Sequence, residues 1–442
     1  MKKRTITFGT DGVRGVANKG LLPEDALRLG LAVSRAFGGR IPIGRDTRLS
    51  GEMLARALSA GAASGGVDVV DLGILPTPGV AALAPRLGAT AAGVVSASHN
   101  PYPDNGIKFF SAEGRKLSSE KEREIESLIE QDLTRPTGSG IGRIDVLGDA
   151  PQMYAEWVLG RLRPSAEGLK VLLDCANGAA YEVAPLVFEE LGVDLTLTGT
   201  EPTGTNINEG CGSTHVENLD ASGHDVAFAF DGDADRVLAL DEKGNVVDGD
   251  KIIAILARDK KERGVLCGEV VVTVMSNLGF FKAMEAMQIP FEVTDVGDRY
   301  VAEAMVRLGA SLGGEQSGHV ILSEHVTTGD GIVTALALLD VMVRSGRPLS
   351  ELAGAMEVYP QTLINVRVEE PASARAVAAS EAVGLTVAEA ESTLGDDGRV
   401  LLRPSGTEPV VRVMVEHTDE TVCREVCEEI SRVVADAGEE GT

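Results

Sequence analysis

The chain has 442 residues, which at roughly 150 residues per domain suggests about three domains and argues against a single core. With 43% hydrophobic and 24% charged residues, its composition is that of a globular protein and excludes a disordered or fibrous chain. The formal net charge is −26, and such a chain repels nucleic acid and anionic membrane surfaces, so we expect neither as a partner.

The location and redox state follow from simple signals. No stretch approaches the roughly 20 apolar residues of a membrane-spanning helix, and no signal-peptide region follows the basic N-terminus, so we expect a cytoplasmic protein. The five cysteines are scattered and odd in number, which argues against a disulfide framework. Cys423 and Cys427 have no clustered zinc ligands near them and are expected to be small buried apolar residues.

The first part of the chain contains a unit of strand, helix, strand, connection and strand, which then occurs twice more. In the first copy the predicted strands are 41–44, 67–72 and 92–95, with helices that end near Ala63 and Leu87. The second copy has strands 170–174, 193–197 and 225–230 and a helix over 183–191. The third has strands 269–274, 291–294 and 310–312, with a helix over 280–287 and another that ends at Leu308.

Continuous Val/Ile/Leu runs that alternate with amphipathic helices are typical of parallel strands covered on both faces. We therefore predict an α/β fold of three similar domains with mixed, mostly parallel sheets. After residue 365 the pattern changes to a strand over 363–368, a helical stretch from 372, a hairpin over 400–415 and a helix over 421–435, which predicts a smaller α+β domain. The predicted domains are 1–148, 149–250, 251–364 and 365–442.

In each of the three copies, the third strand runs into the chemically richest loop. Open α/β sheets bind ligands outside the carboxyl ends of their strands, so these loops are candidates to share one cleft.

The loop after strand 225–230 carries Asp231, Asp233 and Asp235. At the mouth of a cleft, three such carboxylates repel one another unless a cation neutralises them, and oxygen ligands suit Mg²⁺, Mn²⁺ or Ca²⁺. A solvated acidic loop is the alternative. An EF-hand is excluded because Arg236 stands where that loop needs glycine. An aspartate-nucleophile phosphatase, with Asp231 as nucleophile, stays open.

The loop after strand 92–95 carries Ser98 and His99. Ser98 is a candidate nucleophile, but adjacent side chains usually diverge, so His99 is not automatically its base, and a plain Ser/Asn turn fits as well. Lys108 follows between apolar neighbours, where a lysine either extends to solvent or, near a cleft, contacts phosphate or moves protons.

Two further loops offer binding groups. Glu315, Gln316, Ser317 and His319 combine the donors and acceptors that sugar hydroxyls need, although alone they form only a polar loop. Near the C-terminus, a hairpin turn with forked guanidinium groups and exposed N–H groups predicts an anion nest, with a plain turn as the alternative. Its residues are Arg403, Ser405, Gly406, Thr407 and Arg412. Arg14, in a glycine-rich turn near the start, says little by itself.

Taken together and in order, these segments resemble the α-D-phosphohexomutase superfamily along essentially the whole chain. The motifs are Thr10-Asp-Gly-Val-Arg-Gly, Ser96-Ala-Ser-His-Asn-Pro, Asp231-Gly-Asp-Ala-Asp-Arg, Gly314-Glu-Gln-Ser-Gly-His and Arg403-Pro-Ser-Gly-Thr-Glu-Pro. Within the superfamily the chain is most similar to the bacterial phosphoglucosamine mutases, on Gln316 and on segments 104–110, 206–208, 211–215 and 296–301.

The resemblance implies four domains around a central cleft and a role for each site residue. Ser98 would carry a phosphoryl group, and Asp231, Asp233 and Asp235 would bind one Mg²⁺ together with an oxygen of that phosphate. Arg236 would help to hold the phosphoserine, and His99 would bind substrate. The other implied roles are sugar binding (Glu315, Ser317), binding of the phosphate that is not reacting (Arg403, Ser405, Gly406, Thr407, Arg412) and proton transfer or charge stabilisation (Arg14, Lys108, His319).

The implied reaction interconverts glucosamine 6-phosphate and glucosamine 1-phosphate, through phospho-Ser98 and a sugar 1,6-bisphosphate that is intermediate and activator. It would feed UDP-N-acetylglucosamine and cell-wall synthesis, and relatives suggest a homodimer. The alternatives are a phosphomannomutase/phosphoglucomutase of the same superfamily, the aspartate-nucleophile phosphatase, and a sugar-phosphate-binding regulator without chemistry.

An anionic substrate and a net charge of −26 together predict a locally inverted field. We expect cationic side chains to converge with Mg²⁺ into a positive cleft, with the acidic surplus on the outer surface. These cations are Arg14, Lys108, Arg236, Arg403 and Arg412.

Overall fold

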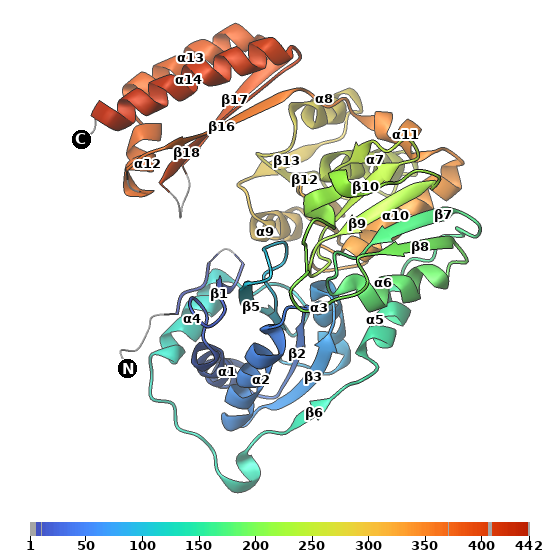
Figure 1. Cartoon of the computed structure of the whole chain (residues 1–442), viewed down its shortest axis with the longest axis vertical. Coiled ribbons are helices and arrows are strands. Elements are labelled where there is room, and N and C mark those ends of the chain that lie inside the picture. Colours follow the sequence, from blue (N-terminus) through green and yellow to red (C-terminus); the bar gives the residue numbers. More distant parts are fainter. Residues whose placement is uncertain (1–5, 10, 370, 405–408, 441–442) are drawn as a thin grey trace. The chain divides into compact units, whose positions relative to one another are not determined.

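The computed structural model describes the chain except residues 1–5, 10, 370, 405–408 and 441–442. It divides into two compact units, Met1–Met275 with Gln288–Ala355, and Ser276–Met287 with Met356–Thr442. Figure 1 labels the helices and strands of both units along the chain.

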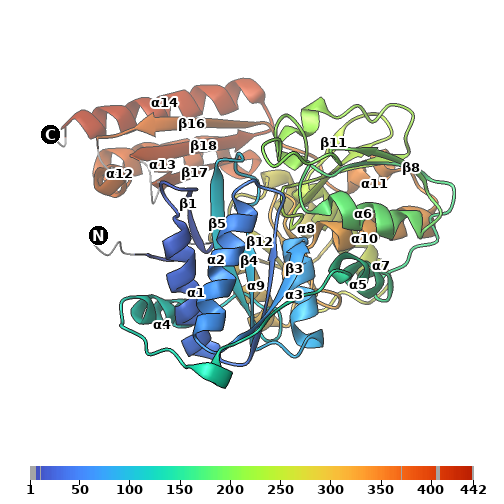
Figure 2. The ribbon, with the colours of Figure 1, turned by 60° about the horizontal axis from the view of Figure 1, so that its bottom comes forward.

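The first sheet of the first unit has the order β1-β5-β4-β2-β3-β6. Its strands are β1 Val13–Val16, β2 Arg40–Arg45, β3 Asp68–Ile74, β4 Ala91–Val95, β5 Asp104–Ser111 and β6 Ile144–Val146. Its helices are α1 Pro23–Phe37, α2 Gly51–Ser64, α3 Thr77–Arg86 and α4 Ser119–Ile129. Helices α1 and α2 lie side by side in Figures 1 and 2, and α3 contacts β2 and β4. Strand β4 is buried along its whole length, as a strand covered on both faces must be.

The next sheets of this unit have the orders β11-β10-β9-β7-β8 and β13-β12-β14-β15. The strands are β7 Lys170–Asp174, β8 Asp194–Thr198, β9 Val226–Phe230, β10 Val237–Asp241, β11 Val246–Val247, β12 Val270–Thr273, β13 Phe291–Thr294, β14 Leu312–Gly314 and β15 Val320–Leu322. The helices are α5 Ala150–Leu159, α6 Ala180–Glu189, α7 Gly249–Glu262, α9 Asp298–Leu308, α10 Gly331–Ser345 and α11 Leu349–Leu352.

One arrangement recurs in these sheets. Parallel strands lie in the order second, first, third, and a fourth strand pairs antiparallel with the third: β5 with β4, β10 with β9, and β15 with β14. The prediction of repeated α/β domains with mixed, mostly parallel sheets is confirmed. The loops that join third to fourth strands are the polar loops of the sequence, and each turns through a left-handed residue: Ser98 (φ 51°), Ala234 (φ 56°) and Gly318 (φ 92°).

A buried hydrogen bond links helix α5 to the start of α10. The Tyr154 hydroxyl donates to Asp330 Oδ2 at 2.5 Å, and Asp330 Oδ1 caps α10 by accepting from the Val333 N–H at 3.0 Å. Both side chains are fully buried. The Asp330 carboxylate therefore loses its hydration and is stabilised only by the few protein groups that donate hydrogen bonds to it.

We predict that Asp330 makes the stability of the chain depend on pH. Burial raises its pKa to about 6 despite the hydrogen bonds it accepts. Because this folded-state pKa exceeds the unfolded one, the folded chain takes up the proton first, and stability should rise by about 2 kcal/mol as the pH falls from about 7 to about 4.5. Urea unfolding of wild type and Asp330→Asn at both pH values measures this. The difference in the free energy of unfolding between the two proteins should change by that amount, and a difference that does not depend on pH contradicts the prediction.

The second unit is built on a sheet of order β16-β18-β17, antiparallel throughout. Its elements are β16 Gln361–Arg367, β17 Gly398–Pro404, β18 Val410–His417, α8 Leu278–Ala286, α12 Pro371–Ala378, α13 Glu381–Leu394 and α14 Glu420–Glu440. The predicted α+β domain with a hairpin is confirmed. Cys423 and Cys427 are buried in its core, as expected.

Helix α8, which the sequence places in the third repeat, groups with the C-terminal residues. The reason is the buried carboxylate of Glu416, which accepts from the Leu278 N–H at 3.0 Å and from Asn277 Nδ2 at 3.1 Å.

Of the helices in the described part of the chain, none has both the length and the apolar character that crossing a membrane requires.

Candidate active site

Ser98 lies in the β4–β5 loop, 2% exposed. Its Oγ donates to Asp231 Oδ2 at 2.6 Å and lies 3.3 Å from Nδ1 of His99. The left-handed backbone at Ser98 (φ 51°) is costly for a residue with a side chain, so the surroundings must hold it in place. The two adjacent side chains converge here, which the sequence alone did not indicate.

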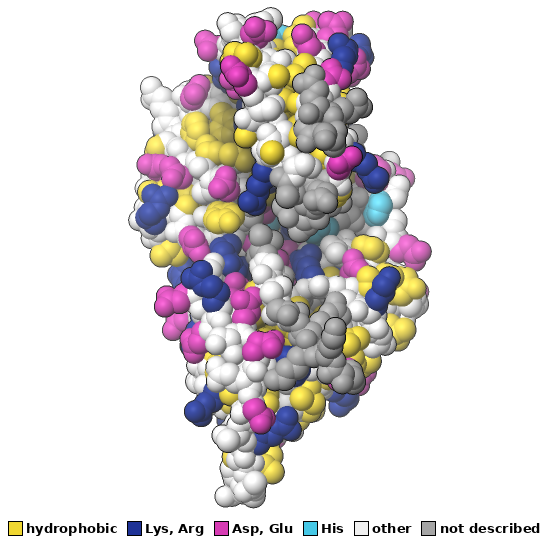
Figure 3. Space-filling model, turned by 90° about the vertical axis from the view of Figure 1, so that its left-hand side faces the viewer, with side chains coloured by type: hydrophobic (Ala, Val, Ile, Leu, Met, Phe, Trp, Pro, Cys, Tyr) yellow, Lys and Arg dark blue, Asp and Glu magenta, His cyan; other side chains and the backbone are white. Residues whose placement is uncertain are grey.

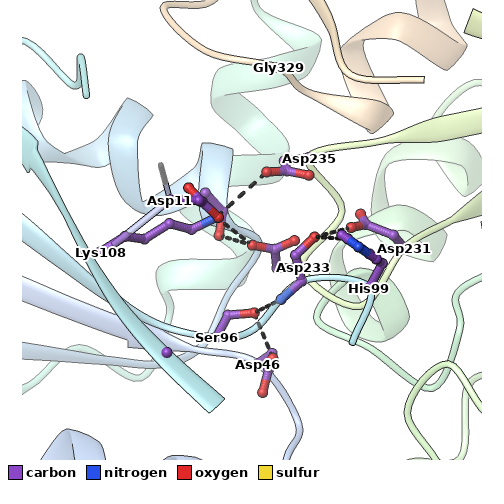
Figure 4. A network of polar contacts seen from close by, with 12 residues as sticks. Asp11, Asp46, Ser96, His99, Lys108, Asp231, Asp233, Asp235 and Gly329 are labelled. Carbon is purple, nitrogen blue, oxygen red and sulfur yellow. Dashed lines mark hydrogen bonds and ion pairs between the residues drawn. The ribbon is translucent and has the colours of Figure 1, made fainter. Parts of the chain in front are cut away.

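A buried polar network, missed at the sequence level, holds this loop. The Arg48 guanidinium donates to the carbonyl oxygens of Ser98 (2.7 Å), Asn100 (2.7 Å) and Pro101 (2.6 Å), and its Nε pairs with Asp46 at 2.8 Å. Asp46 also accepts from the Ser96 hydroxyl at 2.6 Å, and Ser96 Oγ accepts from the Ser98 N–H at 2.9 Å. Figure 4 shows Ser96 between Asp46 and the Ser98 loop. The available signal was Arg45-Asp-Thr-Arg, which also follows a strand end.

Asp231, Asp233 and Asp235 follow β9 and are buried, at 0%, 1% and 5% exposure. One carboxylate oxygen of each lies within 4.8 Å of the others. Burial, followed by repulsion from Asp235 and Asp233, raises the pKa of Asp231 well above its usual value. Positive charge from Lys108 lowers the pKa of Asp235 despite its burial, so the uncompensated charge of the triad falls on Asp231.

These residues fit a metal ion. Oδ1 of Asp233 and Oδ1 of Asp235 are buried and have no hydrogen-bond partner among the described residues. Buried oxygens without partners are costly, and a hard cation with oxygen ligands would satisfy them. The donor set is all oxygen, which suits Mg²⁺, Mn²⁺ or Ca²⁺ and disfavours soft metals.

Lys108, on β5, places its ammonium group among the acidic side chains and is 4% exposed. Its Nζ lies 2.9 Å from Asp233 Oδ2, 3.6 Å from Asp235 Oδ2 and 3.6 Å from Asp11 Oδ2 (Figure 4). Burial lowers the pKa of Lys108, but these carboxylates raise it more, so the net pKa lies well above the usual value. These carboxylates therefore favour the charged form of Lys108.

Asp11 also forms ion pairs with other cationic side chains. It pairs with Arg14, and Lys116 Nζ lies 2.6 Å from its Oδ1. Lys116 also pairs with Asp298 at the start of α9. Asp11 and Asp298 lie inside motifs of the sequence but have no predicted role, and Lys116 has no neighbouring motif that could indicate one. Ion pairing across distant segments leaves no local signal.

The candidate proton carriers differ in environment. Burial, followed by the positive charges of Arg236 and Arg14, lowers the pKa of His99 to about 4, so its imidazole is neutral at neutral pH. His319 is 2% exposed, and its Nδ1 lies 3.7 Å from Asp235 Oδ2. Burial lowers the pKa of His319, but the nearby carboxylates, Asp235 first, raise it more, so the net pKa lies above the usual value. The Gly329 N–H points at His319 Nε2 at 3.1 Å, which places the proton of the neutral ring on Nδ1.

A cavity of about 430 Å³ opens above these groups. Besides backbone, its described lining includes cations (Arg14, Arg236), imidazoles (His99, His319), carboxylates (Asp11, Asp235, Asp298, Glu315) and Ser98. Carboxylates outnumber guanidinium groups in this lining, so side chains alone do not give the positive cleft expected from the sequence. Of the carboxylates that line it, Asp235 belongs to the acidic triad, while Asp11 and Asp298 form ion pairs with Arg14 and Lys116. On the outer face in Figure 3, acidic and basic side chains are interspersed.

The β14–β15 loop brings only part of the predicted sugar-binding set to this cavity. Glu315 and His319 line it, and Glu315 Oε1 accepts from the Gly297 N–H at 3.2 Å. Gln316 Nε2 instead donates to Asp248 Oδ2 at 3.3 Å, at the start of α7. Ser317 Oγ is buried without a hydrogen-bond partner among the described residues and is outside the cavity lining.

In the second unit, Arg403 on β17 stands directly opposite Arg412 on β18. Residues paired in this way lie on the same face of the sheet, where like charges repel. Ser405, Gly406 and Thr407, the rest of the predicted anion nest, lie outside the described residues.

Known families match the chain domain by domain. Models of the phosphoglucomutase/phosphomannomutase family match at residues 5–135 (α/β/α domain I), 154–244 (domain II), 248–359 (domain III) and 363–433 (C-terminal domain). The phosphoglucosamine mutase of Rubrobacter xylanophilus is 70% identical over 438 residues, which cover 99% of each chain. That of Moorella thermoacetica is 53% identical over 441 residues, 97% of this chain and 99% of the relative.

Solved structures share the fold. A phosphoglucomutase/phosphomannomutase family protein from Burkholderia thailandensis has a TM-score of 0.82 and 28% identity, over 99% of this chain and 98% of that one. The N-acetylphosphoglucosamine mutase of Aspergillus fumigatus, solved with GlcNAc-6P and magnesium, has a TM-score of 0.73 at 19% identity, over 98% and 96% of the chains. From its motifs, its repeated sheets and these matches, the chain belongs to the phosphoglucomutase/phosphomannomutase family of the α-D-phosphohexomutase superfamily.

Proposed function

We propose that this chain is an isomerase that interconverts glucosamine 6-phosphate and glucosamine 1-phosphate. The observation that carries the proposal is Ser98, whose Oγ lies 2.6 Å from Asp231 in a buried acidic triad, in a chain 70% identical to a phosphoglucosamine mutase. A hydroxyl beside a metal-binding triad and a cavity of sugar-phosphate size suits a phosphoryl carrier.

In this proposal, Asp231, Asp233 and Asp235 hold Mg²⁺ together with an oxygen of phospho-Ser98. When bound, Mg²⁺ would supply positive charge that stabilises the phosphoryl group in flight. Lys108 adds a fixed positive charge beside Asp233, and Arg236, which lines the cavity, adds another. The protein thus positions and neutralises the group, which is the main task in phosphoryl transfer.

The proposed reaction balances in two transfers. First, the bond between phosphorus and Ser98 Oγ breaks and a sugar oxygen bonds phosphorus to give the 1,6-bisphosphate. The sugar hydroxyl loses one proton and Ser98 Oγ gains one, so the enzyme is left with a free serine hydroxyl. After the bisphosphate turns around, its other phosphoryl group returns to Ser98. Neutral His99, 3.3 Å from Ser98 Oγ, is placed to exchange a proton with that oxygen. Arg14, Lys108 and His319 stay the predicted candidates for proton transfer at the sugar oxygen.

The phosphate that is not reacting is assigned to Arg403, Ser405, Gly406, Thr407 and Arg412. The opposed Arg403 and Arg412 support this, because two guanidinium groups on one face of a sheet supply several donors that can bind one phosphate together. Glu315, Ser317 and His319 are assigned to the sugar side. The domain boundaries, a homodimer and a cytoplasmic location stay predictions, although β6, which still pairs with β3, supports a first domain that reaches residue 148.

The substrate preference gives the direct test. Glucosamine carries a positive 2-amino group, and the cavity lining is rich in carboxylates, which suits a cation. We expect kcat/KM for glucosamine 1-phosphate to exceed that for glucose, mannose and N-acetylglucosamine 1-phosphates by about 10-fold to 100-fold, the range of one or two polar contacts. A coupled assay on the four sugars measures it. A preference for glucose or mannose would assign the chain to the phosphoglucomutase/phosphomannomutase activity instead.

A further inference from the structure

The loop that carries the three aspartates, residues 231–235, is held by hydrogen bonds from the first residues of three helices. Consecutive backbone carbonyls of the loop each accept an N–H from a residue at the start of a different helix. The pairs are Ala179 N–H to Gly232 O (2.8 Å, α6), Thr77 N–H to Asp233 O (2.9 Å, α3) and Gly331 N–H to Ala234 O (3.0 Å, α10). The first turn of a helix has N–H groups without intrahelical partners. These hydrogen bonds therefore satisfy both the N–H groups of the helices and the carbonyl oxygens of the loop. The loop conformation is therefore set by elements outside its own sheet.

Thr77 does more than the other two, because its side chain also reaches a proposed metal ligand. Thr77 Oγ1 donates to Asp233 Oδ2 at 2.6 Å, and both side chains are 1% exposed. Lys108 Nζ reaches the same oxygen at 2.9 Å. Oδ2 of Asp233 is thus engaged, whereas its Oδ1 is buried without a hydrogen-bond partner among the described residues.

The local sequence explains why Thr77 is held rigidly. Pro76 precedes it and Pro78 follows it, at the start of α3. Each proline ring fixes its own φ, and Pro78 restricts the backbone of the residue before it. Thr77 itself has few χ1 rotamers because it is β-branched. Its hydroxyl is therefore a preorganised donor, supplied by the first domain to a loop of the second.

We propose that Thr77 is a positioning residue for the metal site: its hydroxyl fixes the Asp233 carboxylate so that Oδ1 faces the cation. The inference rests on the proposed metal role of Asp231, Asp233 and Asp235. Partners that orient metal ligands typically change metal affinity by about 10-fold to 100-fold when they are lost. A hydrogen bond that only joined two domains would affect stability and leave the affinity unchanged.

The test is direct Mn²⁺ binding, measured by electron paramagnetic resonance titration of the purified full-length protein. Thr77→Val keeps the shape and removes the hydroxyl, Thr77→Ala removes it without risk of a clash, and Thr77→Ser keeps it. We expect the dissociation constant to rise about 10-fold to 100-fold in the Val and Ala variants, and to stay within about twofold of wild type in the Ser variant, since the hydroxyl remains.

The outcomes separate this inference from the function it rests on. If wild type binds Mn²⁺ and the folded Val or Ala variant binds it equally well, the positioning role is overturned while the metal site stands. If wild type binds no Mn²⁺, the proposed metal site itself fails, and this inference with it. Circular dichroism melts identify which variants fold, and the Ala variant carries the test if the Val variant does not.

Discussion

Replacing Ser98 by alanine should abolish the interconversion of glucosamine 6-phosphate and glucosamine 1-phosphate. Without Oγ the enzyme has no atom to carry the phosphoryl group, and loss of a covalent nucleophile costs on the order of 10⁴-fold or more in kcat. A coupled assay over a long time course measures the residual rate. The carboxylates, Lys108 and the cavity remain in this variant, so binding alone should survive.

Intact-mass spectrometry makes this prediction specific to Ser98. Wild-type protein treated with a sugar 1,6-bisphosphate should gain one phosphoryl group, and Ser98→Ala should gain none. The matched control is Ser222→Ala, a serine exposed in a turn outside the site, which should keep both activity and phosphorylation. An aspartate-nucleophile phosphatase predicts the opposite, namely that Ser98→Ala still releases phosphate. In the structure Asp231 Oδ2 accepts the hydrogen bond of the Ser98 hydroxyl, so the two variants Ser98→Ala and Asp231→Asn separate the two readings.

Replacing Lys108 by methionine should lower kcat by about 10²-fold to 10³-fold, the usual cost of removing one preorganised charge that stabilises a transition state. Methionine keeps much of the volume of the buried stem, so the loss reflects the charge. Lys108→Arg keeps the charge but must fit a larger planar group into a site where lysine is 4% exposed, so we expect only partial recovery.

Measuring Mn²⁺ binding provides the control for the Lys108→Met variant. Removing a cation from beside Asp233 and Asp235 leaves the triad more negative, so Mn²⁺ affinity in Lys108→Met should stay the same or rise. A lower kcat together with unimpaired Mn²⁺ binding therefore assigns the effect to phosphoryl transfer. If Lys108→Met retained full activity, the assigned role would be wrong.

The pH dependence of Lys108 follows from its raised pKa. A lysine whose folded-state pKa exceeds its unfolded value contributes stability at all pH values below the unfolded pKa, and loses it only as the pH rises through the folded one. Since the ordinary value is 10.5 and the folded value lies well above it, no alkaline decline in wild-type activity near neutral pH should trace to Lys108. A limb near neutral pH that disappears in Lys108→Arg would contradict this.

Much of the architecture was predictable from local patterns. The strand over 225–230 matches β9 Val226–Phe230, and the strand over 170–174 matches β7 Lys170–Asp174. Their apolar side chains pack against neighbours on both faces of the sheet, which gives continuous apolar runs. Such runs can be located from periodicity and composition alone. The loops that follow the third strands also stood out, because clustered polar residues after a buried strand contrast with their surroundings.

The grouping of α8 and the buried network behind Ser98 were not predictable in this way. Glu416 binds the start of α8 from more than 130 residues away, and Arg48 holds carbonyls of a loop some 50 residues downstream. A carbonyl has no residue identity, so its partner leaves no sequence signal. The same holds for Thr77, which looks like an ordinary residue between two prolines.

The sequence by itself determined that the chain repeats an α/β unit and that each unit ends in a polar loop, and it predicted Ser98 and three aspartates as the residues that carry the chemistry typical of a phosphohexomutase. Only the tertiary structure decided the surroundings of these groups: Lys108 is the cation between Asp233 and Asp235, the imidazole of His99 is neutral beside Ser98, and carboxylates outnumber guanidinium groups in the described cavity lining. The physical reason is that charge states and carboxylate orientations depend on burial and on partners from distant segments, which no local pattern encodes.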